Sequence, residues 1–275
     1  MELNNQVVVV TGGGSGIGEA LARAAHAEGA RHVVVADLNG EQAARVAADI
    51  GGTGVALDVS DEVAVVALVE RTLAAHGPIG LFVSNAGYGT LAGLEDSNER
   101  INHMWGVHVM AHIYAARAVV PSMIANGGGY LLNTASAAGL LTQIGSLSYS
   151  ITKAAAVSLG EWLAISHHHQ GIRVSVLCPQ AVATNIIANS PDFAARAAAG
   201  AGGSASQDGV RTAAEVAQDC VDAIRAETFL VLPHAEVQTY VERKAQDRDR
   251  WLAGMRRFQA TLYGDRPLPG DAMAP

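Results

Sequence analysis

Residues 11–18 read Thr11-Gly12-Gly13-Gly14-Ser15-Gly16-Ile17-Gly18, a glycine-rich turn between two segments of different pattern. Before it, residues 6–11 form a short apolar, β-branched run, which is typical of a strand buried on both faces. After it, residues 19–28 have the pattern of a helix. Such a strand, turn and helix bring bare backbone and a helix N-terminus up to a pyrophosphate. The stretch could be only a tight loop, but this context favours nucleotide binding.

The next expected strand, residues 32–36, ends at Asp37. An acid at this position can accept hydrogen bonds from both hydroxyls of an adenosine ribose, and it repels a 2′-phosphate. Neither Leu38 nor Asn39 supplies a positive charge, and the glycine turn contains no Arg or Lys. The sequence therefore favours NAD over NADP. The alternative is that Asp37 only caps the following helix, residues 41–50.

Strand-like and helical runs alternate along most of the chain, which predicts parallel β-α-β units with helices on both faces of one sheet. The remaining expected strands are residues 53–57, 79–84, 130–134, 172–178 and 229–232. The helices expected between them are residues 61–76, 98–126, 148–169 and 213–226. The fold class is therefore α/β with a doubly wound parallel sheet. Chemistry belongs at the carboxyl ends of the strands, where the sequence places Gly12, Asp37, Asp58, Asn85, Ser136 and Pro179.

Tyr149 and Lys153 stand four residues apart at the start of an expected helix. Residues at this spacing share a helix face, and an ammonium near a phenol lowers the pKa of the phenol. A tyrosine tuned in this way can exchange a proton with an alcohol or a carbonyl. Ser136, thirteen residues upstream, could hydrogen-bond the same oxygen. Taken alone, the pair could also be a packed Tyr beside a solvated Lys.

In combination, the glycine turn, Asn85-Ala86-Gly87, Ser136 and the Tyr149/Lys153 pair resemble a short-chain dehydrogenase/reductase, over about residues 3–232. The resemblance implies a single Rossmann domain with seven parallel strands in the order 3-2-1-4-5-6-7. It also implies that Ser136 orients the substrate oxygen and that Tyr149 is the general acid/base. Lys153 would lower the pKa of Tyr149 and hold the nicotinamide ribose.

The same resemblance implies a binding site for NAD along the carboxyl edge of the sheet. Asp58 and Val59 would flank the adenine, the Asn85–Gly87 segment would pass beneath the cofactor, and residues 179–184 would contact its nicotinamide half. The implied cofactor-binding residues are Gly12, Ser15, Gly16, Ile17, Gly18, Asp37, Leu38, Asp58, Val59, Asn85, Ala86, Gly87, Tyr149, Lys153, Pro179, Val182 and Thr184.

Two residues depart from the family pattern. His108 stands thirteen residues before Pro121, where the family usually has an asparagine thought to hold a water that links the lysine to solvent. We hypothesise that His108 takes over this proton relay, since histidine both donates and accepts protons. The alternative is a packed polar side chain with the relay rerouted. Gln180 replaces the usual glycine after Pro179, and its longer amide should narrow or polarise the substrate pocket.

These features predict an NAD-dependent oxidoreductase that interconverts a secondary alcohol and a ketone. An apolar substrate is suggested by Leu140, Leu141, Ile144, Ile186 and Ile187. Two alternatives stay open: an epimerase or C=C reductase on the same fold, and a nucleotide-sensing module that has lost its chemistry.

The chain is expected to form one domain over residues 1–275, with two appendages. Residues 185–212 are rich in Ala and Gly and are expected to form a substrate lid. Residues 234–275 are expected to form a helical extension and a loose tail, with one helix over residues 236–262. An apolar stripe on that helix covers the pocket or docks a partner, and its charged run, residues 242–250, is the solvated face.

Composition narrows the possible partners. A net charge of −8 and a pI near 5.6 argue against nucleic acid and against anionic membranes. No signal peptide or membrane helix is evident, and Cys178 and Cys220 fit reduced thiols, so we expect a cytoplasmic protein. His167-His168-His169 is expected to end a helix rather than to bind metal. The family resemblance implies a homodimer or homotetramer formed through the helices at residues 98–126 and 148–169.

Overall fold

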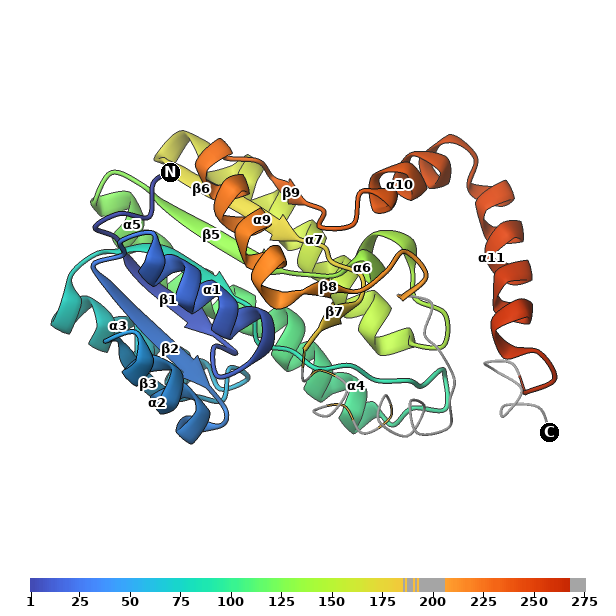
Figure 1. Ribbon diagram of the computed structural model, residues 1–275, viewed down its shortest axis with the longest axis horizontal. Coiled ribbons are helices and arrows are strands. Elements are labelled where there is room, and N and C mark those ends of the chain that lie inside the picture. Colours follow the sequence, from blue (N-terminus) through green and yellow to red (C-terminus); the bar gives the residue numbers. More distant parts are fainter. Residues whose placement is uncertain (185, 187–189, 191, 193–205, 268–275) are drawn as a thin grey trace.

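The computed structural model describes residues 1–184, 186, 190, 192 and 206–267. Its centre is a seven-stranded parallel sheet in the order β3-β2-β1-β4-β5-β6-β9, lying between two layers of helices (Figure 1). This arrangement confirms the predicted doubly wound α/β fold and strand order. The strands are β1 (Val7–Thr11), β2 (His32–Asp37), β3 (Thr53–Ala56), β4 (Ile79–Ser84), β5 (Gly129–Thr134), β6 (Ile172–Leu177) and β9 (Leu230–Val231).

Successive side chains of a strand point to opposite sides of the sheet. Because the strands are almost continuous apolar runs, both faces of the sheet are apolar. Val8 and Val10 of β1 pack against one helix layer, while Val7 and Val9 pack against the other. The first layer contains α1 (Gly16–Ala27), α2 (Gly40–Asp49) and α9 (Ala213–Ala226). The second contains α3 (Glu62–His76), α5 (Ala111–Ala125) and α7 (Leu147–His167), and α4 (Asn98–Trp105) precedes α5 and packs its Met104 near Tyr149.

The helix expected at residues 98–126 is continuous but contains a π-helical turn, η1 (Gly106–Met110), between α4 and α5. The backbone N–H of Ala111 donates to the carbonyl of Gly106, which widens the helix by one residue. The helix Asn98–Ala125 is long and apolar enough to span a membrane: an 18-residue window of it has a mean hydropathy of 1.2, yet 56% of that window is buried inside the protein. We attribute its apolar character to core packing.

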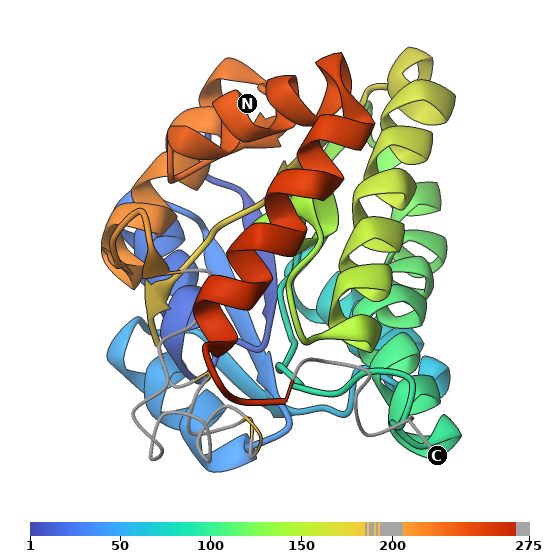
Figure 2. The ribbon, with the colours of Figure 1, turned by 90° about the vertical axis from the view of Figure 1, so that its right-hand side faces the viewer.

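The single helix expected at residues 236–262 is wrong. The structure has two helices, α10 (Glu236–Gln246) and α11 (Arg248–Tyr263), separated at Asp247. Asp247 has extended backbone angles, and its carboxylate accepts a hydrogen bond from the N–H of Arg250, so it starts a new helix. Figure 1 shows α11 standing apart from the body, which it joins through α10, and in Figure 2 the same helix crosses in front of the body.

Three small elements were not predicted. A short helix, α6 (Ala137–Leu141), follows β5, and β7 (Val182–Ala183) pairs with β8 (Arg211–Thr212) in a separate two-stranded sheet. The three histidines at 167–169 do end a helix: α7 passes into a 3-10 turn, η2 (His168–Gln170), which Gly171 terminates with a positive φ of 82°. Most of the expected lid and the last eight residues of the tail lie outside the described residues.

Candidate active site

A cavity of about 610 Å³ runs along the carboxyl edge of the sheet. It brings together the glycine turn, the ends of β2 and β4, and Ser136, Tyr149 and Lys153. Two of the predicted site residues, Gly18 and His108, do not line it. The predicted residues that do are Gly12, Ser15, Gly16, Ile17, Asp37, Leu38, Asp58, Val59, Asn85, Ala86, Gly87, Ser136, Tyr149, Lys153, Pro179, Val182 and Thr184.

The glycine turn depends on backbone that other residues adopt poorly. Gly12 and Gly16 have φ values of +62° and +56°, in the left-handed region that favours glycine. Gly18 packs behind the turn: a Cβ there would lie 2.1 Å from the carbonyl oxygen of Gly12. The role of Gly18 is therefore close packing of α1 against the turn, while the other two glycines shape the cavity wall.

The carboxylate of Asp37 is fixed at one end of the cavity by two backbone groups. Its Oδ2 accepts from the N–H of Gly14 at 2.9 Å, and its Oδ1 accepts from the N–H of Asn39 at 2.9 Å. Asn39, rather than Asp37, caps α2, because its side chain accepts from the N–H of Gln42. The alternative reading of Asp37 as a helix cap is therefore wrong.

Arg45 brings a positive charge to the glycine turn that sequence reasoning missed. Its guanidinium donates to the carbonyl of Gly14 at 3.3 Å and pairs with Glu19 at 3.2 Å. Arg45 lies on α2, 31 residues after Gly14, so a search for basic residues within the turn itself does not find it. Because Glu19 also pairs with Arg23, two guanidinium groups share one carboxylate beside the cavity, and they hold the pKa of Glu19 low.

Asn85, at the end of β4, joins three neighbouring strands. Its amide donates to the carbonyls of Thr11 and Gly12 at 3.2 and 3.3 Å, and its oxygen accepts from the hydroxyl of Thr134 at 3.1 Å. Each of these three side-chain hydrogen bonds of Asn85 joins it to the backbone or side chain of another strand or of the turn. Asn85 therefore holds the turn against the sheet as well as lining the cavity.

Ser136 and Tyr149 present their hydroxyls at the other end of the cavity. Ser136 follows β5 and begins α6, where its oxygen accepts from the N–H of Ala138 at 3.1 Å. A hydrogen bond with Ser136 lowers the pKa of Tyr149, but burial outweighs it, so the pKa of Tyr149 is raised above its ordinary value. The tyrosine is 8% exposed and is accordingly protonated near neutral pH.

Lys153 shares the helix face of Tyr149 but turns toward the sheet. Its Nζ donates to the carbonyl of Thr134 at 2.8 Å and lies 5.8 Å from the centre of the Tyr149 ring. The expectation that Lys153 lowers the pKa of Tyr149 is not met in this structure, because burial dominates there. Burial also lowers the pKa of Lys153 itself, to about 8.

His108 is fully buried in the π-helical turn. Its Nε2 accepts from the N–H of Tyr88 at 3.2 Å, which places the ring proton on Nδ1, 3.1 Å from the hydroxyl of Thr152. Burial lowers the pKa of His108 well below 6.5, so the ring is neutral. The relay role stays a prediction, and these contacts favour the alternative of a packed side chain that fixes the backbone at Tyr88.

Gln180 connects the cavity wall to the C-terminal helices. Its Nε2 donates to Oδ2 of Asp208 at 2.9 Å, and Oδ1 of the same carboxylate accepts from the hydroxyl of Tyr240 at 2.9 Å. Its backbone N–H donates to Nδ1 of His234 at 3.3 Å. Gln180 therefore does add a polar group to the wall, as predicted, but no sequence signal indicated Asp208 or Tyr240 as its partners.

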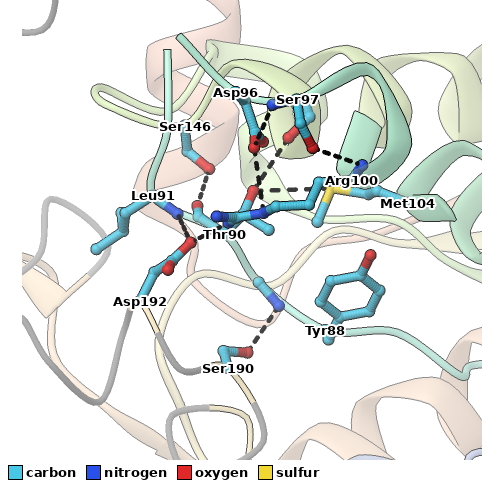
Figure 3. A network of polar contacts seen from close by, with 12 residues as sticks. Tyr88, Thr90, Leu91, Asp96, Ser97, Arg100, Met104, Ser146, Ser190 and Asp192 are labelled. Atoms are coloured by element: carbon cyan, nitrogen blue, oxygen red, sulfur yellow. Dashed lines mark hydrogen bonds and ion pairs between the residues drawn. The ribbon is translucent and has the colours of Figure 1, made fainter. Parts of the chain in front are cut away.

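The segment after β4 forms another part of the cavity wall. The N–H of Gly89 donates to the hydroxyl of Ser190 at 2.8 Å, and the N–H of Leu91 donates to the carboxylate of Asp192 at 3.1 Å. Figure 3 shows Leu91, Ser190 and Asp192 close together. Arg100 of α4 pairs with Asp192 and also with Asp96, the latter at 3.1 Å. These contacts attach two described residues of the expected lid to the substrate end of the cavity.

Two polar residues of this wall were not predicted. Tyr88 and His103 line the cavity, and the hydroxyl of Tyr88 lies 2.7 Å from Nδ1 of His103. Of the apolar residues suggested for the pocket, Ile186 lines the cavity and Ile187 lies outside the described residues. The other three are absent from the lining, namely Leu140, Leu141 and Ile144. The described substrate end is therefore more polar than expected.

Comparison with known proteins decides the family. The sequence model of the short chain dehydrogenase family matches residues 6–194, more than half of the chain. The chain belongs to the short-chain dehydrogenase family. Among curated relatives, meso-2,3-butanediol dehydrogenase of Serratia marcescens is 35% identical over 190 residues, covering 68% of this chain and 75% of the relative. Sorbitol dehydrogenase of Cereibacter sphaeroides is 36% identical over 186 residues, covering 66% and 72%.

Solved structures agree with this assignment. A short-chain dehydrogenase/reductase from Burkholderia phymatum in complex with NAD superposes with a TM-score of 0.81 at 30% identity, covering 90% of this chain and 96% of that one. A 3-ketoacyl-(acyl-carrier-protein) reductase from Brucella melitensis complexed with NADH gives 0.73 at 28% identity, covering 84% and 96%. The chain is therefore an oxidoreductase-family protein with a Rossmann fold and with relatives that act on alcohols.

Proposed function

We propose that this protein is an NAD-dependent dehydrogenase that interconverts a secondary alcohol and a ketone. One observation carries the proposal: the hydroxyls of Ser136 and Tyr149 lie in the same cavity as the glycine turn and Asp37. A dinucleotide that extends along this cavity would reach both groups. The residues of the cofactor end fit such a ligand, because the N-terminus of α1 and the turn offer backbone N–H groups to a pyrophosphate.

Asp37 and Arg45 support NAD rather than NADP. The carboxylate of Asp37 can accept hydrogen bonds from ribose hydroxyls and would repel a 2′-phosphate. Arg45 could attract that phosphate, but its ion pair with Glu19 offsets part of its charge. Lys153 would hold the nicotinamide ribose. The bound nicotinamide would supply the hydride acceptor for oxidation, or the hydride donor for reduction.

The protein itself would position the substrate oxygen and move its proton. The hydroxyls of Ser136 and Tyr149 would both bind that oxygen, with Tyr149 donating a proton during ketone reduction and accepting one during alcohol oxidation. Because the pKa of Tyr149 is raised, its protonated form, which reduction needs, dominates near neutral pH. Oxidation needs the phenolate, so its rate should increase with pH while the rate of reduction decreases.

The substrate end favours an alcohol that carries a second polar group. Tyr88, His103 and Gln180 line it together with the apolar Ile186. The relatives named as butanediol and sorbitol dehydrogenases act on compounds with several hydroxyls. We therefore replace the apolar substrate expected from sequence with a small diol or polyol.

An absorbance assay for NADH tests the proposal, with matched alcohols such as 2,3-butanediol and 2-butanol, with sorbitol, and with larger apolar alcohols. Each reaction is repeated with NADP. We expect turnover of at least one secondary alcohol with NAD, faster for the diol than for its mono-alcohol match. Tight NAD binding without turnover of any alcohol would favour a sensing module, an epimerase or a C=C reductase.

A further inference from the structure

Gln180 lines the cavity, and its backbone is fixed next to Ser136. The peptide group that joins Pro179 to Gln180 is held on both sides. Its carbonyl accepts from the hydroxyl of Ser136 at 3.4 Å, and its N–H donates to Nδ1 of His234 at 3.3 Å. His234 is itself buried, at 3% exposed. Gln180 therefore begins beside the hydroxyl that we expect to bind the reacting oxygen of the substrate.

The partners of the Gln180 amide decide which way it points. Its Nε2 donates to Oδ2 of Asp208 at 2.9 Å, and a carboxylate accepts hydrogen bonds but donates none. Oδ1 of the same carboxylate accepts from the hydroxyl of Tyr240 in α10 at 2.9 Å, so the carboxylate is fixed from a second side. The exchanged orientation of the amide would bring two acceptors together. The NH₂ group of Gln180 is therefore committed to Asp208, and the carbonyl oxygen, Oε1, is left for another partner.

Oε1 of Gln180 is an acceptor without a donor. It is shielded from water, and no described residue donates a hydrogen bond to it. Leaving a buried carbonyl oxygen unpaired is costly, and a hydrogen bond formed in such a low-dielectric setting is stronger than one in water. A ligand that brings an O–H group to this wall gains that hydrogen bond. A ligand with a carbonyl or ether oxygen at the same place sets one acceptor against another.

We propose that Gln180 selects a substrate with a hydroxyl beside the reacting carbon, as in a vicinal diol or a 2-hydroxyketone. The reacting oxygen binds Ser136 and Tyr149, and the neighbouring hydroxyl donates to Oε1 of Gln180. During oxidation the reacting carbon loses hydride to the nicotinamide and its hydroxyl loses a proton to Tyr149, while the second hydroxyl keeps its proton. This inference rests on the proposed dehydrogenase function and adds to it the group that the substrate must carry.

Such a contact sets a preference opposite to that of intrinsic reactivity. The two carbonyls of 2,3-butanedione activate each other, so in solution this diketone accepts hydride more readily than 3-hydroxy-2-butanone does. In the site, the second carbonyl of the diketone faces Oε1 of Gln180, whereas the hydroxyl of the hydroxyketone donates to it. The protein should therefore reduce the hydroxyketone better than the diketone, and a variant without the acceptor should return to the order of solution chemistry.

Three variants of the full chain separate the acceptor from other effects of substitution. Gln180→Met keeps the length of the side chain but has no carbonyl oxygen. Gln180→Glu with Asp208→Asn keeps an acceptor, because the amide at position 208 then donates to the carboxylate at position 180. Gln218→Met is the matched control, since Gln218 donates to Asp222 at 3.0 Å on the exposed face of α9. Thermal melting shows that each variant is folded.

Initial rates with NADH compare 3-hydroxy-2-butanone with 2,3-butanedione, and initial rates with NAD compare 2,3-butanediol with 3-methoxy-2-butanol. We expect kcat/KM of the parent and of the control to favour the hydroxyl-bearing member of each pair by about 30-fold, because the other member leaves Oε1 of Gln180 unpaired. The double variant should keep a preference of at least about tenfold, and Gln180→Met should lose it. A parent that prefers the diketone, a Gln180→Met protein that keeps the preference, or a folded double variant that lacks it would overturn the proposal.

Calorimetric titration distinguishes failure of this proposal from failure of the proposed function. Tyr149→Phe saturated with NAD should bind 2,3-butanediol about tenfold more tightly than 3-methoxy-2-butanol, and adding Gln180→Met should abolish the difference. Turnover of alcohols without a preference in either assay would refute the role of Gln180 and leave the dehydrogenase function intact. If no alcohol or ketone is turned over, the proposed function fails, and the binding difference alone then supports or refutes the role of Gln180.

Discussion

The two ends of the cavity are built in different ways. At the cofactor end, Asp37 and Asn85 lie at the ends of β2 and β4, the strands on either side of β1, and hydrogen bonds to the glycine turn fix both. At the substrate end, Gln180 is held by Asp208, which lies 28 residues further along the chain, and Leu91 is held by Asp192, 101 residues away. The strand order alone therefore brings the cofactor-end residues together, whereas the substrate-end contacts depend on loops and helices that follow β6. Substitutions at the two ends should therefore affect different steps.

Tyr149→Phe removes the proton-transferring group where the two ends meet. We expect kcat to fall by about 10³-fold, because a positioned acid/base contributes roughly 10²–10⁴-fold, while the Kd for NAD stays within twofold. The assay is steady-state turnover together with calorimetric titration of NAD. Tyr130→Phe is the matched control, since Tyr130 is also buried but bonds Ser175 away from the cavity. Near-parental turnover by Tyr149→Phe would remove Tyr149 from the mechanism.

Lys153→Met tests whether burial of the Lys153 ammonium, where the two ends of the cavity meet, lowers the free energy of unfolding. The folded-state pKa of Lys153, about 8, lies below its ordinary 10.5, so the folded protein binds fewer protons between these values and its stability rises with pH there. Below pH 8 the full cost of burying the cation applies, up to about 3 kcal/mol. We expect Lys153→Met to raise the free energy of unfolding by about 1–3 kcal/mol at pH 7, with a smaller gain at pH 9.5.

Urea unfolding of the cofactor-free protein at pH 7 and 9.5 measures this difference. The Met variant should also lose turnover, since it cannot hold the ribose. An equal gain at both pH values would show that packing, rather than burial of the charge, is responsible.

Asp37→Asn changes the cofactor end alone. Removing the carboxylate should shift the ratio of kcat/KM for NAD and NADP about 10²-fold toward NADP, because a like-charge contact costs several kcal/mol. Adding Glu19→Gln should shift the ratio further, since it frees Arg45 to meet a 2′-phosphate. Both ratios come from initial rates at a fixed alcohol concentration, where the KM for alcohol should change little. An unchanged ratio in the double variant would mean that neither carboxylate selects the cofactor.

Asp208→Asn changes the substrate end alone. We expect the KM for alcohol to rise about tenfold while the KM for NAD is unchanged, because Gln180 loses its charged hydrogen-bond acceptor. Asp222→Asn, on the exposed face of α9, serves as the matched control. Equal effects on both KM values would show that the two ends are not independent.

His108→Asn restores the residue usual in the family and should have the smallest effect. The ring is neutral, and both of its nitrogens already have partners. We expect kcat to change by less than about threefold, with the same pH profile, if His108 only holds the backbone of Tyr88. A profile that shifts in His108→Asn and also in His108→Ala would support the relay instead.

Several of the cofactor-end residues that sequence alone located share one property: they stand at the carboxyl ends of parallel strands. Parallel strands bring these ends to one edge whatever the details of packing, so Gly12, Asp37 and Asn85 could be placed without coordinates. Arg45 could not, because its position follows from how α2 packs on the sheet. The pairing of Asp208 with Tyr240 depends on tertiary contacts in the same way.

Local rules also had limits within the correctly placed elements. The spacing of Tyr149 and Lys153 gives their shared helix face, but not the direction of a flexible side chain, and Lys153 extends to the carbonyl of Thr134. Nor does spacing report burial, which decides the direction of the Tyr149 pKa shift. At residues 236–262, the apolar stripe continues past Asp247 and suggests one helix, whereas the capping carboxylate of Asp247 separates α10 from α11.

Direct transfer of hydride from the substrate carbon to the cofactor can be followed with an alcohol deuterated at its carbinol carbon. The substrate would be the secondary alcohol that the parent protein oxidises fastest, and mass spectrometry would read the reduced cofactor. We predict NADH one mass unit heavier than normal, formed by the parent and reduced at least about 10³-fold in rate by Tyr149→Phe. Reduced cofactor without deuterium, or no reduced cofactor at all, would contradict an alcohol dehydrogenase.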